Sequence, residues 1–111
     1  MPRQSVLDMK VSNVYPLLVA KAEKKGRTKA EVNNVITWLT GYDMSAVDLD
    51  MTYGEFFGRA PCYNPRAELI TGSICGVKVE TIEDPLMKRI RQLDKLVDEL
   101  AKGKPMGKIM R

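Results

Sequence analysis

One stretch decides the fold: residues 84–103, DPLMKRIRQLDKLVDELAKG. Its apolar side chains recur at helical spacing and form one stripe, made of Leu86, Ile90, Leu93, Val97 and Leu100. Asp84-Pro85 is typical of a helix start, because aspartate caps the first turn and proline fits the first helical position. Gly103 is typical of a helix end. The stretch therefore predicts a long C-terminal helix with one buried face.

The same stripe also fits a coiled-coil heptad, with Ile90 and Val97 at position a and the three leucines at position d. Arg89 and Asp94 would then pair across the seam. The pattern lasts only about two and a half heptads, and Leu96 widens it as in an ordinary core-facing helix. We therefore expect packing within the chain, against a second apolar face formed by Val32, Val35, Ile36 and Leu39.

That second face follows a capping box. Thr28 and Glu31 have the spacing at which threonine caps the first turn and glutamate reaches back, and Gly41 closes the helix. A preceding helix is expected to open at Tyr15-Pro16, with Ser12 or Asn13 as its cap, and to stop at Gly26. Residues 14–40 thus predict a helical hairpin or a helix-turn-helix.

The remaining segments are shorter. Apolar and polar residues alternate over 7–11, which predicts a strand. Cap-like residues predict short helices near 45–50 and 53–59, the second closed by Pro61, and Asn64-Pro65 predicts another helical turn. Residues 70–82 are typical of extended chain with a turn at Cys75-Gly76, forming a hairpin or pairing with residues 6–11.

Together these elements predict an α+β fold. It is a mainly helical, compact single domain over residues 1–111, with a small β-hairpin or two-to-three-stranded sheet and a long C-terminal helix. The apolar fraction of 44% and the charged fraction of 29% are too balanced for a disordered chain. Histidine is absent, which removes the usual general base and every histidine-containing metal site. Two cysteines, Cys62 and Cys75, are too few for a four-thiolate zinc site.

Compartment and partners follow from charge. The first apolar residues are interrupted by charges and no run approaches the length of a bilayer span, so we expect a cytoplasmic protein without a membrane segment. The net charge of +4 is unevenly distributed. Bases cluster at residues 21–29 and after residue 101, whereas residues 43–58 carry four acids and no base. Alternating patches of this kind suit protein contacts at least as well as nucleic acid.

A nucleic-acid site is nevertheless possible on the helical hairpin. Its phosphate and base contacts would come from Lys24, Lys25, Arg27, Lys29, Asn33 and Asn34. The competing interpretation is that these lysines only solvate an exposed hairpin, and neither the hairpin nor the charge run is specific alone. We favour that second interpretation.

Three further groups of residues could carry chemistry. Cys75 could be a nucleophile, but no histidine exists to activate it, so a packed thiol is the preferred interpretation. Glu80, Glu83 and Asp84 could hold Mg²⁺, although capping and the helix dipole also explain these acids. Trp38 and Tyr42 are expected to pack on the edge of the core. We accordingly predict no cofactor, metal or catalytic residue, and an enzyme using tyrosine, cysteine or carboxylates is the least favoured interpretation.

Word-like motifs across the chain resemble a bacterial family called domain of unknown function 2200. The first block comprises VYPL (14–17), VAKAEKKGRTKAEV (19–32) and WLTGY (38–42); the second comprises ITG (70–72), CGV (75–77), IEDPLM (82–87) and LDKL (93–96). Residues 43–51 match least, so a variable loop or helix is expected there. The resemblance implies a small bacterial cytoplasmic protein and brings no activity, ligand or site residue with it.

The function we predict is a non-enzymatic protein-interaction or homo-oligomeric module, with nucleic-acid binding through residues 14–40 as the alternative. The chain carries seven methionines, a residue type that adapts to irregular apolar interfaces. A homodimer would bury the remaining apolar surface through the 85–102 helix or the tail after Gly103. The candidate interface residues are Met87, Arg89, Asp94 and Leu96.

Overall fold

The computed structural model describes residues 7–74 and 76–110. In chain order its elements are α2 (Val11–Glu23), α3 (Lys29–Thr40), α4 (Tyr53–Gly58), the 3-10 turn η1 (Pro65–Leu69), β1 (Ser73–Ile74), β2 (Val77–Lys78), the 3-10 turn η2 (Val79–Thr81), α5 (Pro85–Ala101) and α6 (Met106–Ile109). They form a compact, mainly helical single domain with a two-stranded antiparallel sheet, which confirms the predicted fold class. The radius of gyration, 12.9 Å, matches the value of about 13 Å expected for a chain of this length.

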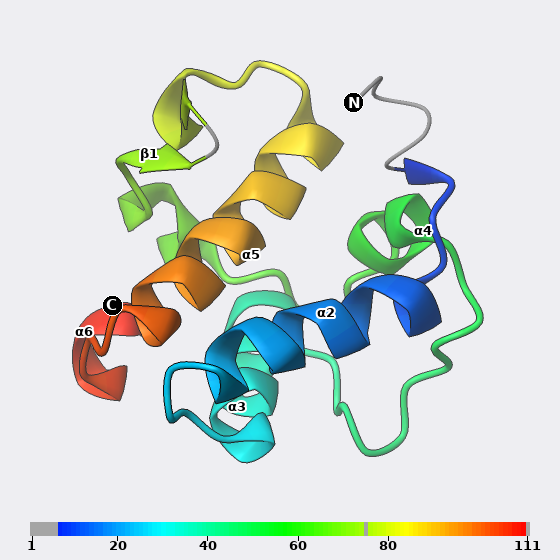
Figure 1. The fold of residues 1–111 in the computed structure, drawn as a ribbon. Coiled ribbons are helices and arrows are strands. Elements are labelled where there is room, and N and C mark those ends of the chain that lie inside the picture. Colours follow the sequence, from blue (N-terminus) through cyan, green and yellow to red (C-terminus); the bar gives the residue numbers. More distant parts are fainter. Residues whose placement is uncertain (1–6, 75, 111) are drawn as a thin grey trace.

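Helix α5 is the centre of the fold, and the other elements pack around it (Figure 1). It begins where the sequence predicts, because the Asp84 Oδ1 atom accepts hydrogen bonds from the backbone N–H groups of Leu86 at 3.1 Å and Met87 at 3.3 Å. Pro85 takes the first turn, where its missing N–H leaves no intrahelical bond unmade. The chain leaves the helix at Gly103, with φ of 86°.

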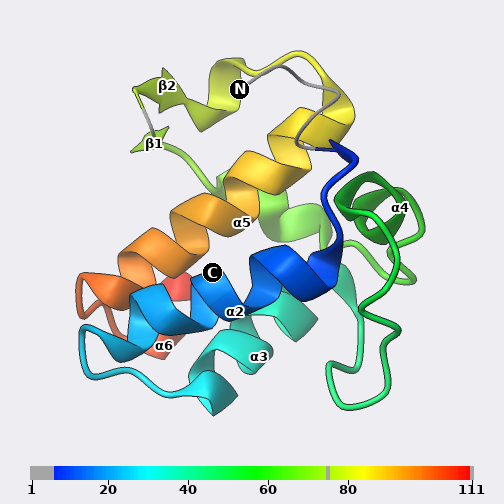
Figure 2. The same cartoon turned by 45° about the vertical axis from the view of Figure 1, so that its right-hand side comes forward.

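The apolar stripe of α5 is buried within the chain. Its members Ile90, Leu93, Val97 and Leu100 are all fully buried, and Leu86 packs partly buried at the edge of the core. Helix α5 contacts α2, α3 and α4 on one side and the hairpin elements on another (Figure 2). The buried face of α3 shares the same core, so the predicted intramolecular packing of the two stripes is confirmed.

The α2–α3 hairpin is also confirmed. The Thr28 Oγ1 atom accepts from the Glu31 backbone N–H at 3.2 Å, and the Glu31 carboxylate accepts from the Thr28 backbone N–H at 3.0 Å. Both halves of the capping box are therefore present at the start of α3. Gly41 ends that helix in the left-handed conformation, with φ of 82°.

The predicted strand over residues 7–11 is wrong, and α2 begins at Val11 rather than near Pro16. Residues 9–12 instead meet the 49–53 loop, where Lys10 and Thr52 form an isolated antiparallel bridge. The N–H groups of Val11 and Ser12 donate to the carbonyls of Met51 and Leu49 at 3.0 and 2.8 Å. This loop satisfies first-turn donors that a side-chain cap would otherwise take, so neither Ser12 nor Asn13 caps the helix.

The predicted helix near residues 45–50 is also wrong; this segment forms turns. The Asp43 carboxylate accepts from the backbone N–H and the hydroxyl of Ser45, and the Asp48 carboxylate accepts from the Asp50 N–H. Aspartate side chains that bond the backbone two residues on favour a turn over a helix. The second short helix is confirmed as α4, where Thr52 and Glu55 form a capping box.

The hairpin alternative is the one observed over residues 70–82. Strands β1 and β2 pair antiparallel, with Ser73 opposite Lys78 and Ile74 opposite Val77. The turn residue Cys75 lies outside the described residues. Before the hairpin, the Asn64 side chain accepts from the Arg66 N–H and opens η1, which confirms the Asn64-Pro65 prediction.

Candidate functional site

A groove of about 510 Å³ lies between the C-terminal halves of α2 and α5. These two ends approach each other while the helices diverge towards their N-termini (Figure 1, Figure 2). Its apolar lining is Leu17, Ala20 and Ala101, and its charged lining is Lys21, Lys24, Lys25, Asp98 and Lys102. The small alanine side chains leave the space between the helix backbones open. We call this surface the α2–α5 groove.

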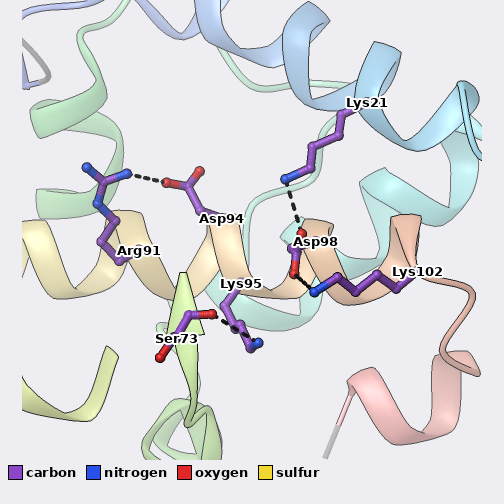
Figure 3. A network of polar contacts seen from close by, with 7 residues as sticks. All are labelled: Lys21, Ser73, Arg91, Asp94, Lys95, Asp98 and Lys102. Atoms are coloured by element: carbon purple, nitrogen blue, oxygen red, sulfur yellow. Dashed lines mark hydrogen bonds and ion pairs between the residues drawn. The ribbon is translucent and has the colours of Figure 1, made fainter. Parts of the chain in front are cut away.

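The charged lining of the groove is strongly basic, with four lysines against one aspartate. Asp98 lies between Lys21 and Lys102, whose Nζ atoms are 3.5 and 3.1 Å from its carboxylate oxygens (Figure 3). Burial raises the pKa of Asp98, but the hydrogen bond from Lys102 and the neighbouring lysine charges outweigh it, so the pKa is lowered overall. Within the described residues Lys24 and Lys25 form no ion pair. Their charge remains available to a partner.

Leu17 gives the groove an exposed apolar wall. Its side chain is 64% exposed, the largest value among the large hydrophobic residues described. At this exposure the side chain keeps about two-thirds of its contact with water, so covering it would stabilise a complex by about 1–2 kcal/mol.

The structure separates the predicted nucleic-acid residues into two groups. Lys24 and Lys25 lie on the groove. Of the others, Arg27 in the turn before α3 pairs with Glu31 at 2.9 Å, Lys29 lies over the Tyr15 ring, and Asn33 accepts from the Tyr15 hydroxyl. Lys24, Lys25, Lys29 and Asn34 are exposed, whereas Arg27 and Asn33 are partly buried.

The predicted interface residues on α5 all make contacts inside the chain. Leu96 is fully buried, and Met87 packs partly buried against the core. Asp94 accepts from the Arg91 guanidinium at 3.0 Å, and burial raises the pKa of its carboxyl group (Figure 3). Arg89 donates to the Phe57 carbonyl at 2.6 Å. The C-terminal end of α5 lines the groove.

The other chemistry-bearing candidates have structural contacts. The Glu80 carboxylate accepts from the Gly72 N–H at 3.1 Å; hydrogen bonds from backbone N–H groups lower its pKa. Asp84 caps α5, as described above, and Glu83 is exposed. Within 7–74 and 76–110, no group of three histidine, cysteine or carboxylate side chains could hold a metal ion.

The aromatic candidates and the described cysteine show no shared site either. Trp38 packs partly buried against the core, and the Tyr42 hydroxyl donates to the Phe56 carbonyl at 2.8 Å. These contacts support the prediction that both rings lie at the core edge. Cys62 is exposed and free.

A second hollow, of about 410 Å³, lies between η1 and the first half of α5. It is lined by Tyr63, Asn64, Pro65, Ala67, Glu68, Pro85, Lys88, Arg89 and Gln92. The Arg89 guanidinium lies over the Tyr63 ring, 4.1 Å from its centroid. We call this hollow the η1–α5 pocket.

Only some of the residues that line the two hollows could be predicted from the sequence. The basic cluster at residues 21–29 contains three of the groove lysines, whereas Asp98, Ala101 and Lys102 come from the far end of the chain. The small residues Ala20 and Ala101 and the Asp98–Lys102 pair at i,i+4 were the available signals. No sequence pattern identified Tyr63 or Gln92 as residues of a pocket.

The chain is thus a small, mainly helical domain with a basic, partly apolar groove on its surface. The chain belongs to the family described as "Uncharacterized protein conserved in bacteria (DUF2200)", whose profile matches residues 5–111. This confirms the resemblance carried by the sequence motifs.

Among solved structures, the chain is similar to the "Crystal structure of uncharacterized protein SP1917". The two share 49% sequence identity with a TM-score of 0.90, over 98% of this chain and 93% of the other. No curated protein matches the chain. In the described part of the chain, no helix has the length and apolar character needed to cross a bilayer.

Proposed function

We propose that this chain is a protein-interaction module whose α2–α5 groove receives an acidic amphipathic helix of a partner protein. The observation that carries the proposal is the exposed Leu17 in a groove lined by four lysines. From Leu17 to its end at Glu23, α2 covers about 9 Å of helix axis along the groove, or nearly two turns. A partner helix of similar length would lay its apolar side chains on Leu17, Ala20 and Ala101.

The lysines that line the groove favour a partner with acidic side chains. Asp98 pairs with both Lys21 and Lys102, so Lys24 and Lys25 are the lysines left for carboxylates on the flank of the incoming helix. Such charges accelerate association and disfavour basic partners more than they add affinity. The proposed complex should therefore weaken as salt rises, but less than a complex held only by phosphate contacts.

Nucleic acid is the less favoured occupant. Its backbone offers nothing apolar to cover Leu17, and Arg27 and Asn33 already pair with Glu31 and Tyr15. A second copy of this chain is also less favoured, because a symmetric pair would set one lysine-lined groove against another. A cytoplasmic, bacterial location fits an interaction module of this kind and is part of the proposal.

The test is fluorescence anisotropy with a labelled acidic amphipathic peptide of about 18 residues, long enough for partial helix formation. Leu17→Asn should weaken binding about tenfold, because it removes the apolar contact. Leu69→Asn is the matched control: Leu69 is 57% exposed but does not line the groove. A peptide of the same composition in scrambled order tests whether the amphipathic pattern is needed.

The lysines are tested in the same assay. Replacing Lys24 and Lys25 together with glutamine should weaken binding about three- to tenfold, with Lys10 and Lys78 replaced together as the charge-matched control. Equal loss in both double variants would contradict the proposal. Tighter binding of duplex DNA with a steep salt dependence would favour the nucleic-acid function, and a dimer mass in light scattering abolished by Leu17→Asn would favour self-association.

A further inference from the structure

We infer that the η1–α5 pocket is a second, independent binding site that takes a small molecule carrying a carboxylate or phosphate group. Its volume of about 410 Å³ falls in the range of ligand pockets. Apolar walls from Pro65, Ala67 and Pro85 stand beside polar groups on α5. This combination suits a ligand with an apolar body and one charged end.

The first argument is the way Arg89 is held. Its Nη1 atom donates to the Phe57 carbonyl at 2.6 Å, and its guanidinium plane lies against the Tyr63 ring. Two contacts of different kinds fix the side chain, yet a guanidinium has five N–H donors. Within the described residues, one hydrogen bond of Arg89 is found. A fixed guanidinium with unused donors is suited to bidentate binding of an oxyanion.

The second argument is that the wall behind Arg89 is itself rigid. The Tyr63 hydroxyl donates to the Gln92 Oε1 atom, and Gln92 Nε2 donates to the Ala67 carbonyl at 3.2 Å. Gln92 is only 3% exposed, so this amide links η1 to α5 inside the core. The chain of contacts from Ala67 to Arg89 holds the pocket in its binding shape before any ligand arrives.

The third argument is the charge of the pocket. Lys88 lines it next to Arg89 and forms no ion pair within the described residues. Both cations lie in the first two turns of α5, where the helix dipole also favours an anion. The acid in the lining, Glu68, is exposed on η1 and pairs with neither cation in the described part of the chain. The oxyanion therefore belongs on the α5 side of the pocket.

The experiment is a titration of the ¹⁵N-labelled full chain followed by NMR, using phenyl phosphate in one arm and benzoate in the other. Both probes carry an apolar ring, so the arms distinguish phosphate from carboxylate recognition. We expect saturable shifts of the Gln92 side-chain amide and the Arg89 Nε–H in at least one arm. The groove residues Leu17 and Ala20 should not shift.

Two substitutions test whether Lys88 and Arg89 bind the oxyanion. Lys88→Gln and Arg89→Lys should each weaken binding roughly tenfold, because each removes charge-assisted hydrogen bonds. Lys78→Gln, on β2 and outside both hollows, should leave the affinity unchanged. Lys88→Gln keeps the test valid if Arg89→Lys disturbs the fold. Shifts that never saturate, shifts spread equally over all lysine-rich surfaces, or wild-type affinity in Lys88→Gln would overturn the inference.

Discussion

At the scale of single residues, two carboxylates one turn apart on α5 behave in opposite ways. Asp94 is partly buried beside Arg91, and the cost of desolvating its charge raises its pKa. Burial also raises the pKa of Asp98, but hydrogen bonding and charge from Lys102, with Lys21 close by, lower it overall. The two carboxyl groups lie on the same helix but differ in pKa, because their neighbours differ.

This difference predicts opposite pH dependences of the free energy of unfolding. Asp98 has a lowered pKa, so its contribution is present above the ordinary value of 3.8 and is lost as the pH falls through its folded-state pKa. Asp94 has a raised pKa, so its contribution is full below 3.8 and is lost as the pH rises through its folded-state pKa. Urea unfolding of Asp98→Asn should show a deficit at neutral pH that shrinks in acid.

Asp94→Asn should behave in the reverse sense: relative to the parent chain it gains stability as the pH rises from the acid range. NMR titration of both carboxyl groups in the parent chain checks the order of the two pKa values. If Asp98 titrated above Asp94, the electrostatic description of α5 would be wrong.

The cap of α3 also belongs to the residue scale. Thr28→Ala removes the hydroxyl that accepts from the Glu31 N–H at 3.2 Å, so unfolding in urea should show a loss of about 0.5–2 kcal/mol. Thr28→Ser keeps the hydroxyl and should restore most of the stability. A serine variant as unstable as the alanine variant would assign the effect to something other than the cap.

At the scale of elements, the stability of the fold depends on the buried stripe of α5. Leu93 is 1% exposed and lies in the core that joins α5 to α3. Leu93→Ala should cost about 2–5 kcal/mol in a urea melt, the range for a leucine that leaves a cavity. Leu69→Ala, at an exposed site on η1, should change stability by less than about 0.5 kcal/mol.

The glycines that follow α2 and α3 offer a matched comparison. Gly26 and Gly41 both have φ of 82°, so alanine is strained at either position. A Cβ atom at Gly41 would lie 2.7 Å from the Cys62 Cβ, whereas one at Gly26 would meet nothing within 4 Å. Gly41→Ala should therefore lower the melting temperature clearly more than Gly26→Ala. Equal shifts would mean that the 61–64 loop moves away freely.

Elements with local signals could be predicted from the sequence, and those set by distant contacts could not. The helix starts at Thr28 and Asp84 could be predicted, because each side chain caps a backbone N–H only two or three residues away. The alternation over residues 7–11 instead suggested a strand, because nothing nearby reveals that Leu49 and Met51 supply acceptors for the start of α2. Cap-like residues predicted a short helix near 45–50, whereas the carboxylates of Asp43 and Asp48 accept from backbone N–H groups two residues on and form turns.

At the scale of the whole molecule, the candidate site joins two ends of the chain. Lys24 and Lys25 could be recognised in the sequence as part of a basic cluster, but their neighbours Asp98 and Ala101 are more than seventy residues away. Only the packing of α2 along α5 brings them together. The stripe on α5 fitted both a heptad seam and packing within the chain, and the core of this chain covers it, as the favoured interpretation predicted.

A charge swap across the α2–α5 groove tests the proposed function most directly. Lys24 and Lys25 are both replaced by glutamate, and the acidic amphipathic peptide is matched by one with lysines at its acidic positions. We predict that the substituted chain binds the acidic peptide about tenfold more weakly than the parent and regains affinity for the basic peptide, since opposite charges again face each other. Unchanged binding of the acidic peptide, or no recovery with the basic peptide, would contradict the assignment of the groove.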